Sequence, residues 1–161
     1  MRVDLIAVGR IKPGPEKDLF GIFSERFDAQ GRNQSLGPLR LVEVEEKRRL
    51  ERAELSEREG EKILEHLPKG AKLVALDERG KPLESKDFAA KLGAWRDEGI
   101  QTTVFVIGGA GGLSNAVRKR ADLMISFGKQ TWPHMLARAM LAEQLFRATT
   151  ILAGHPYHRE G

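Results

Sequence analysis

The sequence predicts an α/β fold in which a largely parallel sheet is flanked by helices. Apolar, strand-like runs alternate along the chain with helical patterns, and this order is typical of strand–helix–strand units. Residues 102–107 (TTVFVI) form a continuous apolar strand of the kind that is buried on both faces of a parallel sheet. The chain has 161 residues, which is enough to bury a substantial core, so we expect one domain over residues 1–161.

The first part of the chain carries two predicted strands and one helix. Residues 3–8 are apolar except for Asp4 and predict a buried first strand. After a loop with two prolines, a helix follows whose apolar residues share one face: Leu19, Phe20, Phe23 and Phe27. Residues 30–38 predict a loop, and the alternating pattern of residues 39–44 predicts a second strand.

Residues 45–61 are almost entirely charged, with both signs interspersed. This pattern favours a solvated helix or a mobile loop with many ion pairs over a binding role. Ser56 and Glu59 have the spacing of a capping box, so an ordered helix is expected to begin at Ser56 and to end near Leu67.

The second part of the chain continues the alternation. Residues 72–76 predict a third strand that ends in a turn over residues 79–82. Ser85 is expected to cap a helix whose buried face holds Phe88, Leu92 and Trp95. A glycine loop, residues 108–112, follows the strand at 102–107. Ser114 is then expected to cap a further helix, and residues 121–127 predict a short fifth strand.

Residues 127–147 (FGKQTWPHMLARAMLAEQLFR) combine a flexible loop with the most apolar helix of the chain. Pro133 is expected at the first helical position, where its missing N–H costs nothing. Between residues 135 and 146 the strongly polar residues are few: Arg138, Glu143 and Gln144. A polar stripe this narrow predicts a buried or interfacial helix.

Composition limits the function classes. The chain has no cysteine, which excludes disulfides and thiolate metal sites. The short apolar run near the N-terminus contains Asp4 and suits neither a signal peptide nor a membrane span, so we expect a cytoplasmic protein. The net charge of +4 lies within residues 118–161, whose seven Lys or Arg face three acidic residues. Charge alone is equally compatible with a polyanion partner and with a solvated face.

The glycine loop at residues 108–112 predicts contact with a ligand rather than a simple turn. It does not fit a dinucleotide-binding fingerprint, because Ser114 stands where the third glycine is needed and no acidic residue follows at the usual interval. It also lacks the Lys-Ser/Thr pair of a P-loop. What remains is a stretch of bare main chain that can lie flat against a ligand.

The polar C-terminal tail carries a second candidate site. Two histidines, a phenol and a guanidinium fall within five residues: His155, Tyr157, His158 and Arg159. Aromatic rings stack on unpaired bases, and cationic side chains bind phosphates, so the tail favours RNA contact over a frayed terminus. His134, at the start of the apolar helix, is a further candidate near the ligand loop.

At these motifs the sequence resembles a known family. TTVFVIGGAGGLS, the loop before TWPH, the helix LARAMLAEQLFRA and the ending HPYHRE are similar to the ribosomal large-subunit pseudouridine N3-methyltransferases, the RlmH family. The resemblance runs from VGR near the start, through LDERGKPLES, to the last residues. This chain departs from the family at Ala110 and Gly111, where the family has Pro or Ser followed by an acidic residue.

The resemblance implies a SPOUT-type fold with a C-terminal trefoil knot, a rare exception to ordinary chain topology. It implies a homodimer that uses S-adenosylmethionine to methylate N3 of a pseudouridine in large-subunit ribosomal RNA, on the assembled ribosome. The motif match gives the donor-binding residues: Leu76, Gly108, Phe127, Gly128, Lys129, Gln130, Thr131 and Trp132.

The catalytic candidates are His155, Tyr157, His158, Arg159, Arg138 and His134. One of the tail histidines could accept the N3 proton, with Tyr157 stacking on the base and Arg159 or Arg138 holding the anion or a phosphate; the sequence does not choose among them. Two alternatives stay open: a non-catalytic ribosome-binding module, and a dinucleotide oxidoreductase, which the glycine loop disfavours.

Overall fold

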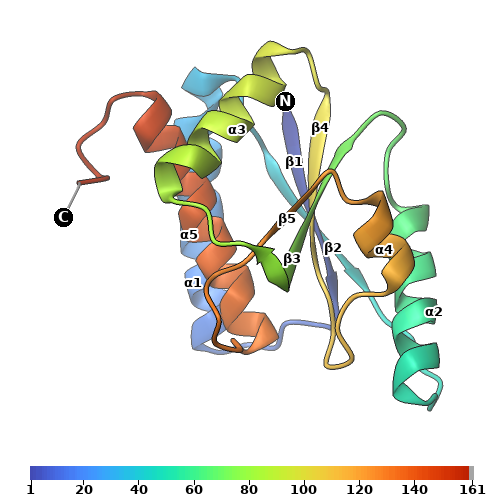
Figure 1. Ribbon diagram of the computed structural model, residues 1–161. Helices are drawn as coiled ribbons and strands as arrows, with labels where there is room; N and C mark the ends of the chain where they lie inside the picture. Colours follow the sequence, from blue (N-terminus) through green and yellow to red (C-terminus); the bar gives the residue numbers. More distant parts are fainter. Residues whose placement is uncertain (160–161) are drawn as a thin grey trace.

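The computed structural model describes residues 1–159, and within them five strands form one sheet (Figure 1). The strands are β1 (Arg2–Val8), β2 (Leu39–Val44), β3 (Lys72–Lys81), β4 (Thr102–Ile107) and β5 (Leu123–Ile125). All neighbouring pairs are parallel, in the order β2-β1-β4-β3-β5. The α/β fold with a parallel sheet is therefore confirmed.

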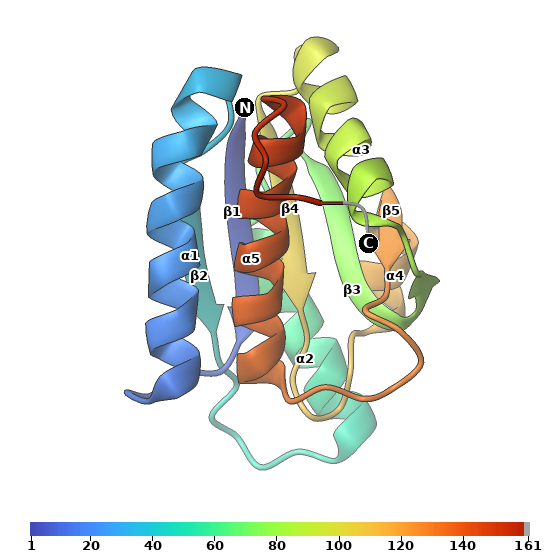
Figure 2. The ribbon, with the colours of Figure 1, turned by 90° about the vertical axis from the view of Figure 1, so that its left-hand side faces the viewer.

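Helices cover both faces of the sheet, as Figures 1 and 2 show. They are α1 (Pro15–Gly31), α2 (Arg52–Glu65), α3 (Ser85–Asp97), α4 (Asn115–Arg120) and α5 (His134–Leu152), with a 3₁₀ turn, η1, at Arg32–Gln34. Helices α1, α3 and α5 lie on one face, and α2 and α4 lie on the other. No helix within residues 1–159 is long and apolar enough to cross a membrane.

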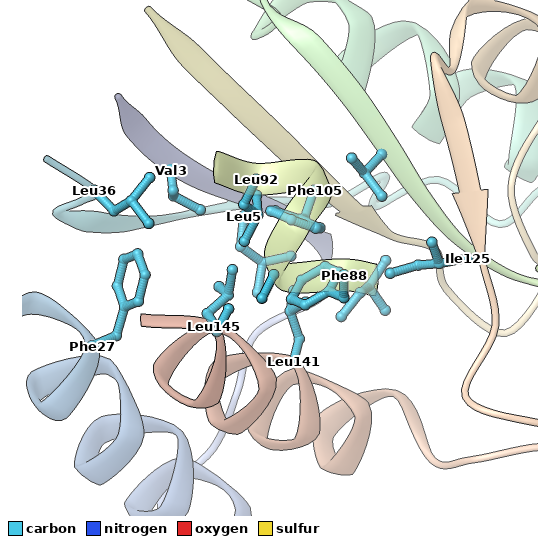
Figure 3. Packing of buried hydrophobic residues seen from close by; sticks show 14 of the residues in the cluster. Val3, Leu5, Phe27, Leu36, Phe88, Leu92, Phe105, Ile125, Leu141 and Leu145 are labelled. Carbon is cyan, nitrogen blue, oxygen red and sulfur yellow. The ribbon is translucent and has the colours of Figure 1, made fainter. Parts of the chain in front are cut away.

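Two apolar layers hold the helices on the sheet. Successive strand residues point to opposite faces, so β1 sends Leu5 toward α1, α3 and α5 and Ile6 toward α2 and α4. Figure 3 shows the first layer, where Phe105 of β4 lies beside Phe88 and Leu92 of α3, and Phe27 of α1 lies toward Val3 and Leu36. The central strand β4 is buried along its whole length, because both of its faces are covered. This confirms the prediction for TTVFVI.

Arg138 of α5 fastens this helix to the sheet. Its side chain is completely buried, and its Nη1 lies 2.6 Å from Glu43 Oε2 of β2. Its Nη2 donates to the carbonyl oxygens of Val8 (3.1 Å) and Gly9 (2.9 Å) at the end of β1. Glu43 Oε2 also accepts from the Ile11 amide at 2.8 Å. Burial alone would raise the pKa of Glu43, but these hydrogen bonds outweigh it and hold the pKa below its ordinary value.

Three predicted helix starts were wrong. α2 begins at Arg52, one turn before Ser56, because Ser56 is buried and donates its hydroxyl to the Gly111 carbonyl instead of capping. Ser85 is the first residue of α3, and its hydroxyl donates to Gln144 at 2.7 Å. Pro133 is the residue before the first turn of α5 and keeps an extended ψ of 137°. The cap by Ser114 is confirmed, since its hydroxyl accepts from the Val117 amide.

The turn predicted at residues 79–82 was also wrong, because β3 continues to Lys81. Lys81 pairs with Ile125 after a register shift, and its carbonyl accepts from the Ser126 amide at 3.0 Å. A side chain on Gly80 would collide with the main chain of Ile125, so only glycine permits this close crossing. The C-terminal trefoil knot that the resemblance implies stays a prediction.

Replacing Arg138 with Met should lower the free energy of unfolding by roughly 3 kcal/mol, because it leaves the Glu43 carboxylate without its buried partner. Urea unfolding measures the loss. The matched control is Arg58→Met, since Arg58 forms an exposed pair with Glu61 at 3.2 Å. That change should cost less than about 0.5 kcal/mol. Equal effects of the two substitutions would show that the buried pair does not hold α5.

Candidate functional site

A cleft of about 400 Å³ opens beyond the carboxyl ends of β3, β4 and β5. Ligands of open parallel sheets bind at this edge, because the connecting loops converge there. The structure brings most of the predicted donor-binding residues together in the cleft wall: Leu76, Gly108, Phe127, Gly128, Gln130, Thr131 and Trp132. His134 also lines the cleft. Lys129 lies in the same loop and is exposed, but it is not part of the wall.

Bare main chain forms one side of the cleft. A Cβ on Gly108 would lie 3.0 Å from the carbonyl carbon of Gly112 and 3.1 Å from Leu113 Cδ2. Gly112 has a φ of +79°, which L side chains rarely adopt, and its amide donates back to Gly109 at 2.9 Å. The glycine loop is therefore a tight turn, and Gly108, Gly109 and Gly112 line the cleft with main chain alone.

The opposite side is the loop between β5 and α5. The Ser126 hydroxyl donates to the Gly128 carbonyl (2.6 Å) and accepts from the Gly128 amide (3.0 Å). Trp132 Nε1 donates to the Phe127 carbonyl at 3.1 Å. Gly128 itself has a φ of +106° and open space around its Cα. These bonds fold residues 126–132 into a defined wall and leave Trp132 38% exposed.

Helix α2 holds the glycine loop in place. Arg52 Nη2 donates to the Ala110 carbonyl (3.3 Å), and Ser56 Oγ donates to the Gly111 carbonyl (3.1 Å). A Cβ on Gly60 would overlap Ser114 Oγ, so the helix packs directly on the loop's end. The prediction that residues 45–61 are merely solvated was wrong for this face of the helix. Positions 52, 56 and 60 are four residues apart and so share one face of the helix. This spacing is the sequence pattern that indicates a face in contact with the rest of the protein.

Glu59, on the same face of α2, is only 7% exposed, and its Oε1 has no hydrogen-bond partner within the described residues. The two carboxylate oxygens would lie 3.3 and 3.4 Å from a Cβ on Gly109. Burial, together with the negative charge of Glu46, raises the pKa of Glu59 above its ordinary value. Both effects disfavour the charged form of this carboxyl group relative to its form in water.

An ion pair that the sequence analysis missed forms another part of the cleft wall. Arg118 Nε of α4 lies 2.9 Å from Asp77 Oδ2, in the residue that follows Leu76. Asp77 Oδ1 also accepts from the Arg79 amide at 2.9 Å. The pair links β3 to α4 through two residues that are 41 positions apart in sequence. Charged residues at strand ends are common, and nothing in the sequence spacing marks this pairing.

The tail lies on the last turns of α5 and not in the cleft. The Tyr157 ring packs on Phe146 at 4.7 Å between centroids, and Arg147 stacks over it at 4.9 Å. The Tyr157 hydroxyl donates to Glu143 at 3.1 Å, and His158 Nδ1 lies 3.1 Å from Arg147 Nη1. Burial first, and then the charge of Glu143, raise the pKa of Tyr157. Glu160, the last residue of the HPYHRE motif, lies outside the described residues.

The predicted site residues thus divide into two groups. His134 belongs to the cleft, whereas Tyr157 is bonded to Glu143, nine residues further along α5 and about 14 Å along the helix axis. His155 and Arg159 are exposed on the tail. Arg138 is occupied by Glu43 and two carbonyl groups and does not face the solvent. Within residues 1–159 no group of three His, Cys, Asp or Glu side chains could hold a metal ion.

The chain is similar over nearly its whole length to other proteins. Residues 1–158 match the family described as "Predicted SPOUT methyltransferase". A protein of Paramagnetospirillum magneticum named ribosomal RNA large subunit methyltransferase H is 55% identical over 159 residues, which cover 99% of each chain. A protein of the same name from Ruegeria sp. (strain TM1040) is 52% identical with the same coverage. Among solved structures, the A. aeolicus TrmH/SpoU tRNA modifying enzyme has a TM-score of 0.49 at 15% identity, over 98% of this chain and 81% of that chain.

Replacing Glu59 with Gln should remove a pH dependence of stability. The unfolded chain loses the Glu59 proton near the ordinary pKa of 4.5, and the folded chain loses it at higher pH. The folded state therefore binds more protons in this window, and the free energy of unfolding falls as the pH rises through it. Urea unfolding at several pH values should show wild type losing stability relative to Glu59→Gln as the pH rises. Substitution of the exposed Glu57 by Gln should leave the profile unchanged.

Proposed function

Because this chain belongs to the SPOUT methyltransferase family, we propose that it transfers a methyl group from S-adenosylmethionine to N3 of a pseudouridine in large-subunit ribosomal RNA. The observation that carries the proposal is the match over 99% of both chains to relatives named ribosomal RNA large subunit methyltransferase H. Membership of this family argues against the alternative hypothesis of a dinucleotide-dependent oxidoreductase. The incomplete glycine fingerprint agrees with this.

The cleft fits the proposed donor. Apolar side chains of Leu76, Ile107 and Ile125 give a wall for a flat aromatic base, and the main chain at Gly108 is free of side-chain atoms. Thr131 and Gln130 add groups that can form hydrogen bonds with a sugar or an amino acid moiety. A volume of about 400 Å³ lies within the usual range of cofactor pockets.

The donor supplies an already activated methyl group, so the chain's own task is to hold the acceptor in line and to manage one proton. N3 of pseudouridine is a weak nucleophile until its proton leaves. His155 and His158 are the candidates to accept that proton, since a neutral imidazole ring has one nitrogen that can accept a proton. Tyr157 could stack on the base, and Arg159 could hold the anion or a phosphate. His134, in the cleft wall, would contact the substrate from the other side.

The separation of tail and cleft supports a homodimer in which the tail of one subunit completes the cleft of the other. One subunit leaves Leu19 (41%) and Ile22 (44%) of α1 strongly exposed. Beside them is a largely apolar groove of about 330 Å³ between α1 and α5. Its lining residues are Leu19, Phe23, Phe127, Leu136, Ala139, Met140, Glu143 and Gln144. A second copy would cover this face, and would explain a helix that is apolar on more than one side.

We place the reaction on the assembled ribosome, as the resemblance implies, and therefore in the cytoplasm, where the sequence analysis places the protein. The competing reading is a non-catalytic module that only docks on ribosomal RNA. The two differ in the need for a donor, because a binding module has no use for the cleft described above. Calorimetric titration with S-adenosylmethionine separates them directly: saturable binding supports the enzyme, and its absence supports the module.

Mass spectrometry of ribosomal RNA from cells that lack this protein tests the function. One large-subunit pseudouridine should be lighter by a single methyl group, and wild-type protein should restore the mass. Gly108→Val should fail to restore it, because the added side chain would press on Gly112 and Leu113 and fill the cleft wall. An unchanged set of large-subunit modifications in the deletion strain would contradict the proposal.

Mixing two inactive variants tests the shared site. A chain without residues 155–161 has an intact cleft, and Gly108→Val has an intact tail. If each site is built from two subunits, co-expression should restore about a quarter of wild-type methylation, because half of the dimers are mixed and each has one complete site. A tail that serves its own cleft predicts no recovery. Light scattering of each variant checks that the dimer itself is preserved.

A further inference from the structure

A second cleft, of about 580 Å³, lies next to the first, between the loop after β1 and the start of α5. Its lining residues are Arg10, Ile11, Lys12, Pro13, Glu16, Pro133, His134 and Met135. His134 belongs to the walls of both clefts. One imidazole therefore separates the proposed methyl-donor site from a second space of nucleotide size.

The loop that carries the basic residues of this cleft is fixed in place. Arg138 holds the carbonyl groups of Val8 and Gly9, and Glu43 holds the amide of Ile11. Residues on either side of Arg10 are thus bonded to groups on β2 and α5. A loop that is already ordered loses little conformational entropy when it binds, so it can contribute affinity efficiently.

The charge of the cleft is positive and unpaired. Arg10 and Lys12 are exposed, and within residues 1–159 neither side chain forms a hydrogen bond or an ion pair. Arg10 adds to the positive field that lowers the pKa of Glu43, whose carboxylate is already bonded to Arg138. Glu16 is the one acidic residue among those that line the cleft. Two free cations and a neighbouring imidazole match the chemistry of phosphate groups.

We propose that this second cleft binds the phosphodiester backbone of the RNA substrate beside the target nucleotide. Arg10 and Lys12 contact the phosphates, Pro13 and Pro133 face the sugar, and the target base reaches past His134 into the first cleft. The inference rests on the proposed function, because it takes ribosomal RNA as the substrate. It adds a backbone-binding site on the β1–α1 loop, separate from the tail and from the donor-binding wall.

The test compares two double variants of the full-length protein. The substrate for both is large ribosomal subunits from cells that lack this protein. Arg10→Ala with Lys12→Ala should raise KM for the subunits about tenfold, because two charge-assisted contacts are lost. The slope of log affinity against log salt should become shallower by about two. The affinity for S-adenosylmethionine and the melting temperature should not change, because both side chains are exposed and lie outside the first cleft.

The matched control is Arg32→Ala with Lys69→Ala, which removes the same charge from exposed positions in η1 and just before β3. It should leave KM and the salt slope at wild-type values.

Glu16→Gln gives a test of opposite sign, since loss of the acidic group should lower KM for the subunits. The proposal is overturned if both double variants behave alike, if Glu16→Gln has no effect, or if Arg10→Ala with Lys12→Ala weakens donor binding instead. If the wild-type protein methylates no ribosomal RNA, the proposed function is contradicted, and this inference is contradicted with it.

Discussion

The buried guanidinium of Arg138 is the interaction on which the rest of the structure depends. It joins three elements, α5, β2 and β1. Arg138 belongs to α5, and it bonds to Glu43 of β2 and to the carbonyl groups of Val8 and Gly9 at the end of β1. A buried charge is tolerated only where its partners are well placed, so the position of α5 is closely specified. His134 lies one turn before Arg138, and its place between the two clefts follows from this anchorage.

Main chain and side chains have different tasks at the carboxyl edge of the sheet. The first cleft is shaped by glycine, since a Cβ at position 108 would meet the main chain of Gly112. The shape is maintained by polar groups of α2: Ser56, outside the cleft, and Arg52, which also lines it. A wall without side chains can approach a ligand closely, but it has little rigidity of its own. The hydrogen bonds from α2 supply that rigidity and explain why a highly charged helix carries buried polar residues.

Helix α5 connects the two groups of candidate residues while keeping them apart. Its first turn borders both clefts, and Glu143, nine residues later, holds Tyr157 of the tail. Bonds to Glu143 and Arg147 place the tail beside the exposed apolar groove of α1 and α5. The same helix thus presents the proposed donor cleft, the proposed dimer face and the tail. A homodimer through this face is the arrangement that would let the two groups meet.

Local chemistry predicted the elements of this fold more reliably than their ends. The apolar periods found each strand, and Phe88, Leu92 and Trp95 are buried as expected. The errors in helix starts lie at Ser56, Ser85 and Pro133, where a residue suited to a helix start was assigned to that role. Ser56 and Ser85 instead bond to distant partners, Gly111 and Gln144. A hydroxyl group can bond equally well to a local or a distant partner, and sequence shows only the local one.

The sequence by itself determined the parallel α/β fold, the cleft-lining loops and the chemistry of the tail, because apolar periodicity, glycine and ring-bearing residues act locally. Only the tertiary structure decided that Glu59 is buried, that Arg118 pairs with Asp77, and that Arg138 is an anchor rather than a free cation. It also separated the tail from the cleft within one subunit. These features depend on groups from distant parts of the chain meeting in three dimensions, and charge pairing over such separations leaves no period or spacing in the sequence.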